Sequence, residues 1–265
     1  MLQIYRRLWQ VNWAEQWQYR ANLLMYLLYW LVSPIVYLAV WTTVARGQGT
    51  VSGLSANDFA TYYLALLVVN HLTSEITIHI LGYKIQDGTL ANELLRPVHP
   101  ILTNTLINNL AFKALNLMAL IPIWLLLCAL FRPDFGTVTP PSLLLALPAV
   151  AIGFGINFLL GATITCVAFW TTRVYALNEF YYALFMLLGG LFVPLDLLPA
   201  LVQKIAQFLP FQLSIYFPIQ LALGRLAPDA IARSFALGLL WLGLALAIFL
   251  ATWRAGVKRF SAVGA

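Results

Sequence analysis

The sequence predicts an all-α membrane protein with six transmembrane helices. Of its 265 residues, 62% are hydrophobic and only 9% are charged, whereas a soluble domain carries about 25% charged residues. Apolar stretches of about 20 residues, the length that crosses a hydrocarbon core about 30 Å thick, recur along the chain. A single soluble core would leave no surface for so much apolar side chain, so most of it must face lipid or other helices.

Each expected span is bounded by charge, proline or glycine. The fourth is the longest and contains Pro148, Gly153, Gly155 and Gly161, which predicts a helix that is kinked, tilted or prolonged beyond the bilayer. With no internal repeat or flexible linker, the chain is expected to form one domain. The six spans are expected at residues 23–45, 59–81, 105–131, 143–171, 175–193 and 234–253.

Two further segments predict helices that do not cross the membrane. Residues 1–20 carry an apolar stripe at near-helical spacing, with Arg6 and Arg7 on other faces, which predicts an amphipathic helix in the membrane interface. The alternative is a soluble amphipathic helix packed on a partner. Residues 194–233 are proline-rich yet oily, which favours a re-entrant or interfacial helix and a second short helix at 211–223. The stripe of the first segment comprises Leu2, Tyr5, Trp9, Trp13 and Trp17.

Basic residues set the expected orientation. The formal net charge is +6, but the 15 Lys and Arg are scattered rather than clustered, which argues against nucleic-acid binding and leaves lipid as the neighbour. Ten of them, Lys113 included, fall on the side that holds the N-terminus, and five fall on the other. The positive-inside rule therefore predicts both termini in the cytoplasm.

Polar residues inside the second expected span are the first candidates for function. His71, Glu75 and His79 are four apart and are expected to stack on one helical face. Three interpretations stay open: a hydrogen-bonded packing stripe, a lining of the substrate pathway, and a metal or proton-relay site. No His-Glu-x-x-His pattern or further ligand cluster is present, so no metal site is predicted. The stripe comprises Asn70, His71, Ser74, Glu75 and His79.

The fifth expected span begins with Asn178, Glu179 and Tyr182 among other aromatic residues. Glu179 is expected to pair with Arg173 near the cytoplasmic interface. If Glu75 and Glu179 instead face one cavity, the pathway would favour cationic or amphipathic cargo, with the tyrosines adding cation–π attraction.

The loop between the second and third spans contains a short amphipathic helix. Asp87-Gly88 predicts a turn and Pro97 ends what precedes it. About two helical turns fit between them, with Leu90, Leu94 and Leu95 on or near one side. Such a helix can insert an apolar knob into a groove on another protein, or it can rest on lipid.

These motifs resemble those of a known family. The runs 87–90 and 93–97 resemble the segment between the second and third spans of ABC-2 type transporter permeases, and the run 192–195, with 198–199 and 209–211, resembles the stretch after their fifth span. The resemblance covers essentially the whole chain.

The resemblance implies a set of roles. Residues 88–97 would include a coupling helix that docks on ATP-binding cassette ATPase subunits, and residues 194–223 would form re-entrant extracellular helices. A second permease chain, identical or different, would pair with this one around a pathway lined largely by the second and fifth spans, in the bacterial inner membrane. The implied coupling residues are Asp87, Gly88, Thr89, Leu90, Glu93, Leu94, Leu95, Arg96 and Pro97.

The chain itself is not expected to be an enzyme. It has no Gly-x-x-x-x-Gly-Lys-Ser/Thr loop to hold nucleotide phosphates, so ATP and Mg²⁺ would be used by the partner ATPase and no cofactor by this chain. The alternative function is an ion-coupled secondary transporter or channel that uses Glu75 and the histidines, although the inverted repeat of many such carriers is absent. A membrane-embedded enzyme would need a convergent nucleophile or metal site, which is not indicated.

Overall fold

The computed structural model describes the backbone of residues 2–260 and, within that range, all side chains except those of residues 2–5, 20, 22–24, 29 and 104. Regular secondary structure in this part is helical, and its β-pairing is limited to one isolated bridge between Val51 and Leu54. The predicted all-α class is confirmed. Met1 and residues 261–265, and with them the exact positions of the two termini, lie outside the described residues.

The helices of the first half are α1 (Leu2–Gln18), α2 (Arg20–Gln48), α3 (Ala56–Thr73), the π-helix η1 (Ile78–Gly82), α4 (Tyr83–Gln86), α5 (Leu90–Leu94), the π-helix η2 (Ile101–Leu106) and α6 (Ile107–Phe131). Those of the second half are α7 (Pro140–Cys166), the short 3₁₀ turn η3 (Val167–Phe169), α8 (Val174–Leu188), the 3₁₀ turn η4 (Leu195–Leu197), α9 (Ala200–Ala206), α10 (Phe211–Ser214), α11 (Tyr216–Ala222) and α12 (Pro228–Arg259).

Five helical stretches of the described chain are long and apolar enough to cross a membrane. The fifth expected span, 175–193, is helical only in α8, whose 15 residues extend about 22 Å at 1.5 Å per residue. Gly190 follows in a left-handed conformation with φ of 90°, where the Tyr62 hydroxyl donates to its carbonyl oxygen at 2.7 Å. The exact count of six spans therefore stays a prediction. The five stretches are Met25–Gln48, Ala56–Gln86, Ile101–Phe131, Pro140–Phe169 and Pro228–Arg259.

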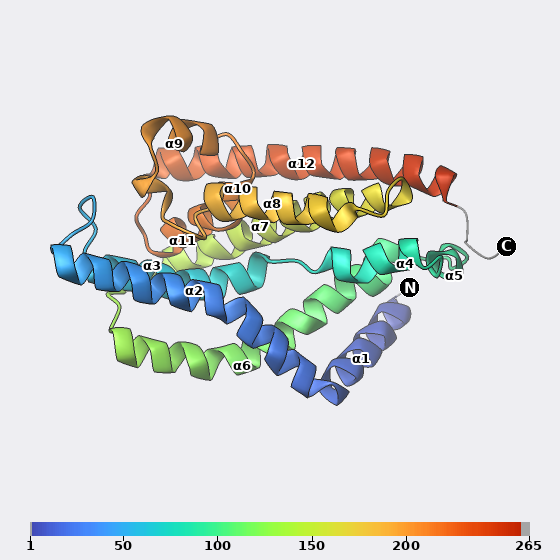
Figure 1. Cartoon of the computed structure of the whole chain (residues 1–265), viewed down its shortest axis with the longest axis horizontal. Helices are drawn as coiled ribbons and strands as arrows, with labels where there is room; N and C mark the ends of the chain where they lie inside the picture. The colour runs from blue at the N-terminus through green and yellow to red at the C-terminus, as the bar shows by residue number, and fades with distance from the viewer. Residues whose placement is uncertain (1, 261–265) are drawn as a thin grey trace.

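The long helices form an elongated bundle with two distinct ends (Figure 1). The helices α4 and α5 lie at one end, together with the end of α12 and the beginning of α1. At the other end lie α9 and the loop that joins α2 to α3. Chain segments near the two termini thus share one end of the bundle, as an even number of passes requires.

The helix α7 is the centre of one half of the bundle, because α12, α10 and α11 all pack against it. Small residues allow the closest of these approaches. A Cβ atom on Gly153 would lie 2.9 Å from the Cα of Ser214 and 3.0 Å from the carbonyl oxygen of Leu213. The backbones of α7 and α10 therefore touch at this point.

The helix α1 packs on α6 of the same chain rather than standing apart. The Asn108 side chain donates to Asn12 at 3.0 Å, and Trp13 packs against a buried cluster around Phe112. Trp17 is 57% exposed, which suits a side chain that contacts lipid headgroups. Leu2 and Tyr5 of the predicted stripe are among the side chains outside the description.

The segment 194–223 folds as the short helices α9, α10 and α11. The latter two are buried against α7, whereas α9 is peripheral. Leu201 on α9 and Phe208, two residues after it, are each 71% exposed. Such outward apolar side chains suit contact with lipid. Whether these helices re-enter the membrane from outside stays a prediction.

Gly153→Ala is expected to lower the thermal unfolding midpoint, because the new methyl group meets main-chain atoms of α10 that cannot move aside. The expected loss is about 1–3 kcal/mol. Gly243→Ala is the matched control, since a Cβ there meets no atom within 4 Å and alanine favours the helix by about 0.5–1 kcal/mol. Thermal unfolding of the detergent-solubilised variants would measure both, and equal midpoints would contradict the contact.

Candidate functional site

The second apolar stretch is interrupted in its middle. The helix α3 ends at Thr73, residues 74–76 are not helical, and helical structure resumes at Thr77 and continues into η1. Ser74 is extended, with φ of −60° and ψ of 160°. Within a bilayer, backbone groups freed by such a break need other partners, since each unmet group costs several kcal/mol.

Lys113 on α6 supplies partners at the end of α3. Its ammonium group donates to the carbonyl oxygen of His71 at 2.8 Å, to the carbonyl oxygen of Ser74, and to the Ser74 hydroxyl at 3.3 Å. His71 Nε2 lies 3.0 Å from the carbonyl oxygen of Lys113, so the two helices hold each other reciprocally. A cation at the carboxyl end of a helix is also favoured by the helix dipole.

Lys113 corrects the sequence-based orientation count, which placed it on the cytoplasmic surface. Its side chain is buried in the bundle, with the ammonium nitrogen 5.1 Å from the centre of the Phe154 ring. Without it, nine basic residues remain against five. The excess of basic residues therefore stays on the side that holds the N-terminus.

Three further side chains form hydrogen bonds with the main chain of the break. Asn157 on α7 donates to the carbonyl oxygen of Thr73 at 3.0 Å, and Asn109 on α6 accepts from the Ile76 amide at 2.9 Å. The Glu75 carboxylate accepts from the Thr77 amide at 2.5 Å. The side chains of α6, α7 and the segment itself thus replace several of the hydrogen bonds that a continuous helix would have made.

The break also overturns the expected stacking of His71, Glu75 and His79 on one helical face. A stack at spacing four needs an uninterrupted helix, and this one ends two residues before Glu75. His71 turns toward α6 as a packing residue, while Glu75 lies against Gly161 of α7, where a Cβ atom would come within 2.2 Å of its Oε1. Gly161 therefore makes room for a carboxylate.

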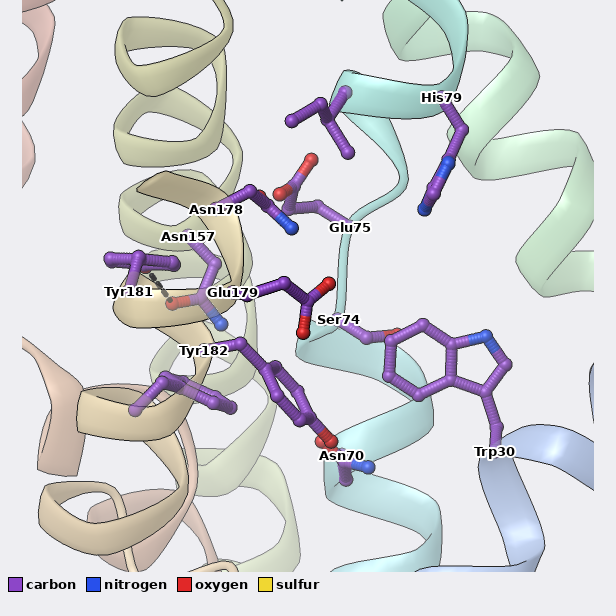
Figure 2. A pocket seen from close by; sticks show the side chains of 12 residues that line it. Trp30, Asn70, Ser74, Glu75, His79, Asn157, Asn178, Glu179, Tyr181 and Tyr182 are labelled. Carbon is purple, nitrogen blue, oxygen red and sulfur yellow. Dashed lines mark hydrogen bonds between the residues drawn. The ribbon is translucent and has the colours of Figure 1, made fainter. Parts of the chain in front are cut away.

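A polar cavity of about 110 Å³ lies beside the break, between α2, α3, α7 and α8 (Figure 2). Figure 2 shows Glu75 and Glu179 extending into it from opposite sides, with Trp30 facing them from α2. All pathway candidates predicted from the sequence line this cavity except His71. The lining residues are Trp30, Asn70, Ser74, Glu75, Ile78, His79, Asn157, Asn178, Glu179, Tyr181, Tyr182 and Phe185.

Glu179 does not pair with Arg173, contrary to expectation. The ion pairs within the described residues are Lys84–Glu93, Asp58–Arg225 and Asp229–Arg233. Arg173 precedes α8 as its N-cap and is not helical, and positions six apart on a helix would in any case lie about 120° apart around the axis and about 9 Å apart along it. The acid is left facing the cavity.

Several residues of this region were not identified from the sequence. Lys113 was counted among the cytoplasmic basic residues, and no pattern in the sequence singled out Asn109, Asn157 or Trp30. The signal that could have found Lys113 is its isolation within an apolar run, because an ionisable residue inside a membrane span is a functional candidate by default.

The loop after α4 forms a second candidate site at the end of the bundle. Leu90 of α5 is fully buried, in a cluster with Ile85, Phe249 and Trp253. Leu95, the first residue after the helix, is 87% exposed. The expectation that Leu95 lies on the side of Leu90 and Leu94 was therefore wrong, because α5 ends at Leu94 and a neighbouring position points about 100° away.

Two contacts hold this loop rigidly. Lys84 and Glu93 form an ion pair at 2.6 Å across the turn at Gly88, which has φ of 76°. The His99 ring lies on Trp253 of α12, with ring centres 4.8 Å apart, and its Nδ1 accepts from the Ile101 amide. Burial lowers the pKa of His99 from its ordinary value of about 6.5, which favours the neutral ring that can accept this hydrogen bond.

No metal-binding cluster is evident where the structure describes the chain, since no three His, Cys, Asp or Glu side chains lie close enough together to hold an ion. The two cysteines, Cys128 and Cys166, are not joined by a disulfide.

An all-helical bundle with five membrane-length apolar helices defines a multi-pass membrane protein. Comparison with known protein families matches residues 31–264 to the family described as "ABC-2 family transporter protein". The chain belongs to this family, and it is a membrane permease of the ABC transporter type without an ATPase of its own. No curated protein matches the chain significantly in sequence.

Lys113→Met is expected to destabilise the chain by about 1–3 kcal/mol, because it leaves buried carbonyl oxygens of α3 without donors. The measurement is the thermal unfolding midpoint in detergent. Lys258→Met, which removes an exposed cation from α12, is the matched control and should leave the midpoint unchanged. Equal midpoints for the two variants would show that Lys113 does not hold the break together.

Proposed function

We infer that this chain is the permease subunit of an exporter powered by separate ATPase subunits. Membership of the ABC-2 family over residues 31–264 carries this proposal, and the absence of a phosphate-binding loop from the sequence supports a separate energy source. ATP and Mg²⁺ would be bound by the partner. The chain would lie in the bacterial inner membrane with both termini in the cytoplasm, in line with its basic-residue bias.

The loop around α5 is the proposed docking site for the ATPase. It combines a buried anchor with an exposed apolar contact, since Leu90 is fully buried and Leu95 is 87% exposed. A lone leucine projecting from a rigid loop is suited to a hydrophobic groove on another protein. The alternative from the sequence, a loop that rests on lipid, would not require the Lys84–Glu93 pair that braces it.

A short segment of chain connects α5 to the polar cavity, so a movement of α5 can be transmitted there. Only the turn at 87–89 separates α5 from α4, and α4 continues directly from η1, which begins just after the break. Displacement of α5 by an ATPase would therefore pull on Glu75 and its neighbours. We propose that the cavity is part of the cargo pathway and that this linkage changes its shape.

A second permease chain would complete the transporter. The apolar side chains on the outer surface of α2 and α8, among them Val32, Val36 and Phe180, are exposed in the single chain. Either lipid or a second permease, identical or related, would cover them. The cavity lies between these two helices, so pairing there would put it near the centre of a dimer.

An ion-coupled carrier or channel is the competing function, and the two carboxylates beside one cavity are the observation that favours it. Flux driven by a proton or sodium gradient through the purified chain alone would support this competitor and contradict the permease proposal.

Leu95→Asp is expected to reduce co-purification of the ATPase at least about tenfold, because a desolvated carboxylate replaces the apolar contact. Leu95 is preferable to Leu94, which packs against the buried cluster and whose substitution would disturb the fold. Asn92→Asp adds the same charge at an exposed position of α5 and serves as the control. Undiminished co-purification with Leu95→Asp would exclude this docking site.

A further inference from the structure

We propose that the cavity beside the break binds a monovalent organic cation, such as a quaternary ammonium group carried on a small apolar body. This inference deepens the proposed function, on which it rests, by assigning the cargo class of the permease. The cavity is negatively charged, has a hydrogen-bonding group free in its wall, and is surrounded by aromatic side chains.

The charge of the cavity is negative. Glu75 and Glu179 both line it, and neither belongs to an ion pair of the described residues. Lys113 does not line the cavity, and its ammonium protons are directed at main-chain oxygens at the end of α3. Two carboxylates with one ammonium group behind them leave about one negative charge, which suits a monovalent cation and repels an anion.

Asn70 is the independent sign that the cavity receives a ligand. Its side chain lines the cavity and the residue is only 5% exposed. No hydrogen bond joins its amide to any side chain or backbone group that the structure describes. In Figure 2 the Asn70 amide lies at the cavity wall below Tyr182, where a molecule in the cavity can reach it. A hydroxyl or carbonyl group on the ligand would satisfy it.

The walls favour an organic cation over a metal ion or a hydrated inorganic one. Tyr181, Tyr182 and Phe185 lie along α8, and Trp30 faces them from α2. Aromatic faces attract alkylated ammonium groups and do not replace the water shell of a small inorganic ion. Fewer than three metal-ligating side chains converge at any point in the described chain, which agrees with an organic ligand.

The pair of choline and 3,3-dimethylbutan-1-ol isolates the effect of charge, because the hydroxyl group of each stays un-ionised at pH 8. The two molecules have nearly the same shape, but the first has a quaternary nitrogen where the second has carbon. Isothermal titration of the full chain in phosphatidylcholine nanodiscs at pH 8 would measure both, with empty nanodiscs as the blank. At this pH ordinary histidine side chains are neutral, and the lipid has no net charge that would concentrate the cation.

The cation is expected to bind at least about tenfold more tightly than its neutral isostere. Glu179→Gln, which changes an exposed residue and therefore leaves the fold intact, is expected to weaken cation binding about tenfold. Asn70→Leu is expected to weaken it severalfold. Asp229→Asn removes an equal charge from an exposed pair on α12 and should have no effect.

Three results would overturn the proposal: no saturable binding of the cation, equal affinity for the two molecules, or an unchanged affinity in Glu179→Gln. None of them depends on the ATPase, because binding is measured on the permease alone. Loss of the predicted ATPase association would contradict the proposed function while leaving a cation site in place, so the two failures are distinguishable.

Discussion

The structure depends on how the interrupted second span satisfies its backbone hydrogen bonds. A helix that stops at Thr73 and resumes at Thr77 in the middle of a bundle has no bulk water to complete its hydrogen bonds. The Lys113 ammonium donates to two carbonyl oxygens at the end of α3, while Asn109, Asn157 and Glu75 each bond one further main-chain group. Four side chains thereby hold an irregular segment in one conformation.

Function follows from this irregular segment because it separates residues that a regular helix would have aligned. His71 is used for packing against α6, whereas Glu75 and His79 are directed to the cavity. The same break is connected through η1 and α4 to α5, which carries the exposed Leu95. One continuous segment of chain therefore joins the proposed ATPase contact to the proposed cargo site. It is helical from Thr77 to Gln86, and the turn at 87–89 connects it to α5.

Hydropathy was enough to predict the class of protein and the approximate positions of the long helices, because long apolar runs have few structural alternatives in lipid. The break was not predictable, since Ser74, Glu75 and Ile76 include neither glycine nor proline. Its stabilising residues come from α6 and α7, and their proximity is a tertiary property.

Lys113 was assigned to the surface because counting charges assumes that a lysine lies in water. The residues that line the cavity were predicted better than their geometry. Polar residues in a membrane span serve mainly in packing or in a pathway, so their identity alone indicates such a role.

The most direct test of the account is hydrogen–deuterium exchange at the amides of Ile76 and Thr77, measured by mass spectrometry on the chain in nanodiscs. If side chains hold the break, these amides exchange nearly as slowly as those of α3, and Asn109→Ala accelerates exchange at Ile76 in particular. Exchange as fast as in an open loop, or no change in Asn109→Ala, would contradict it.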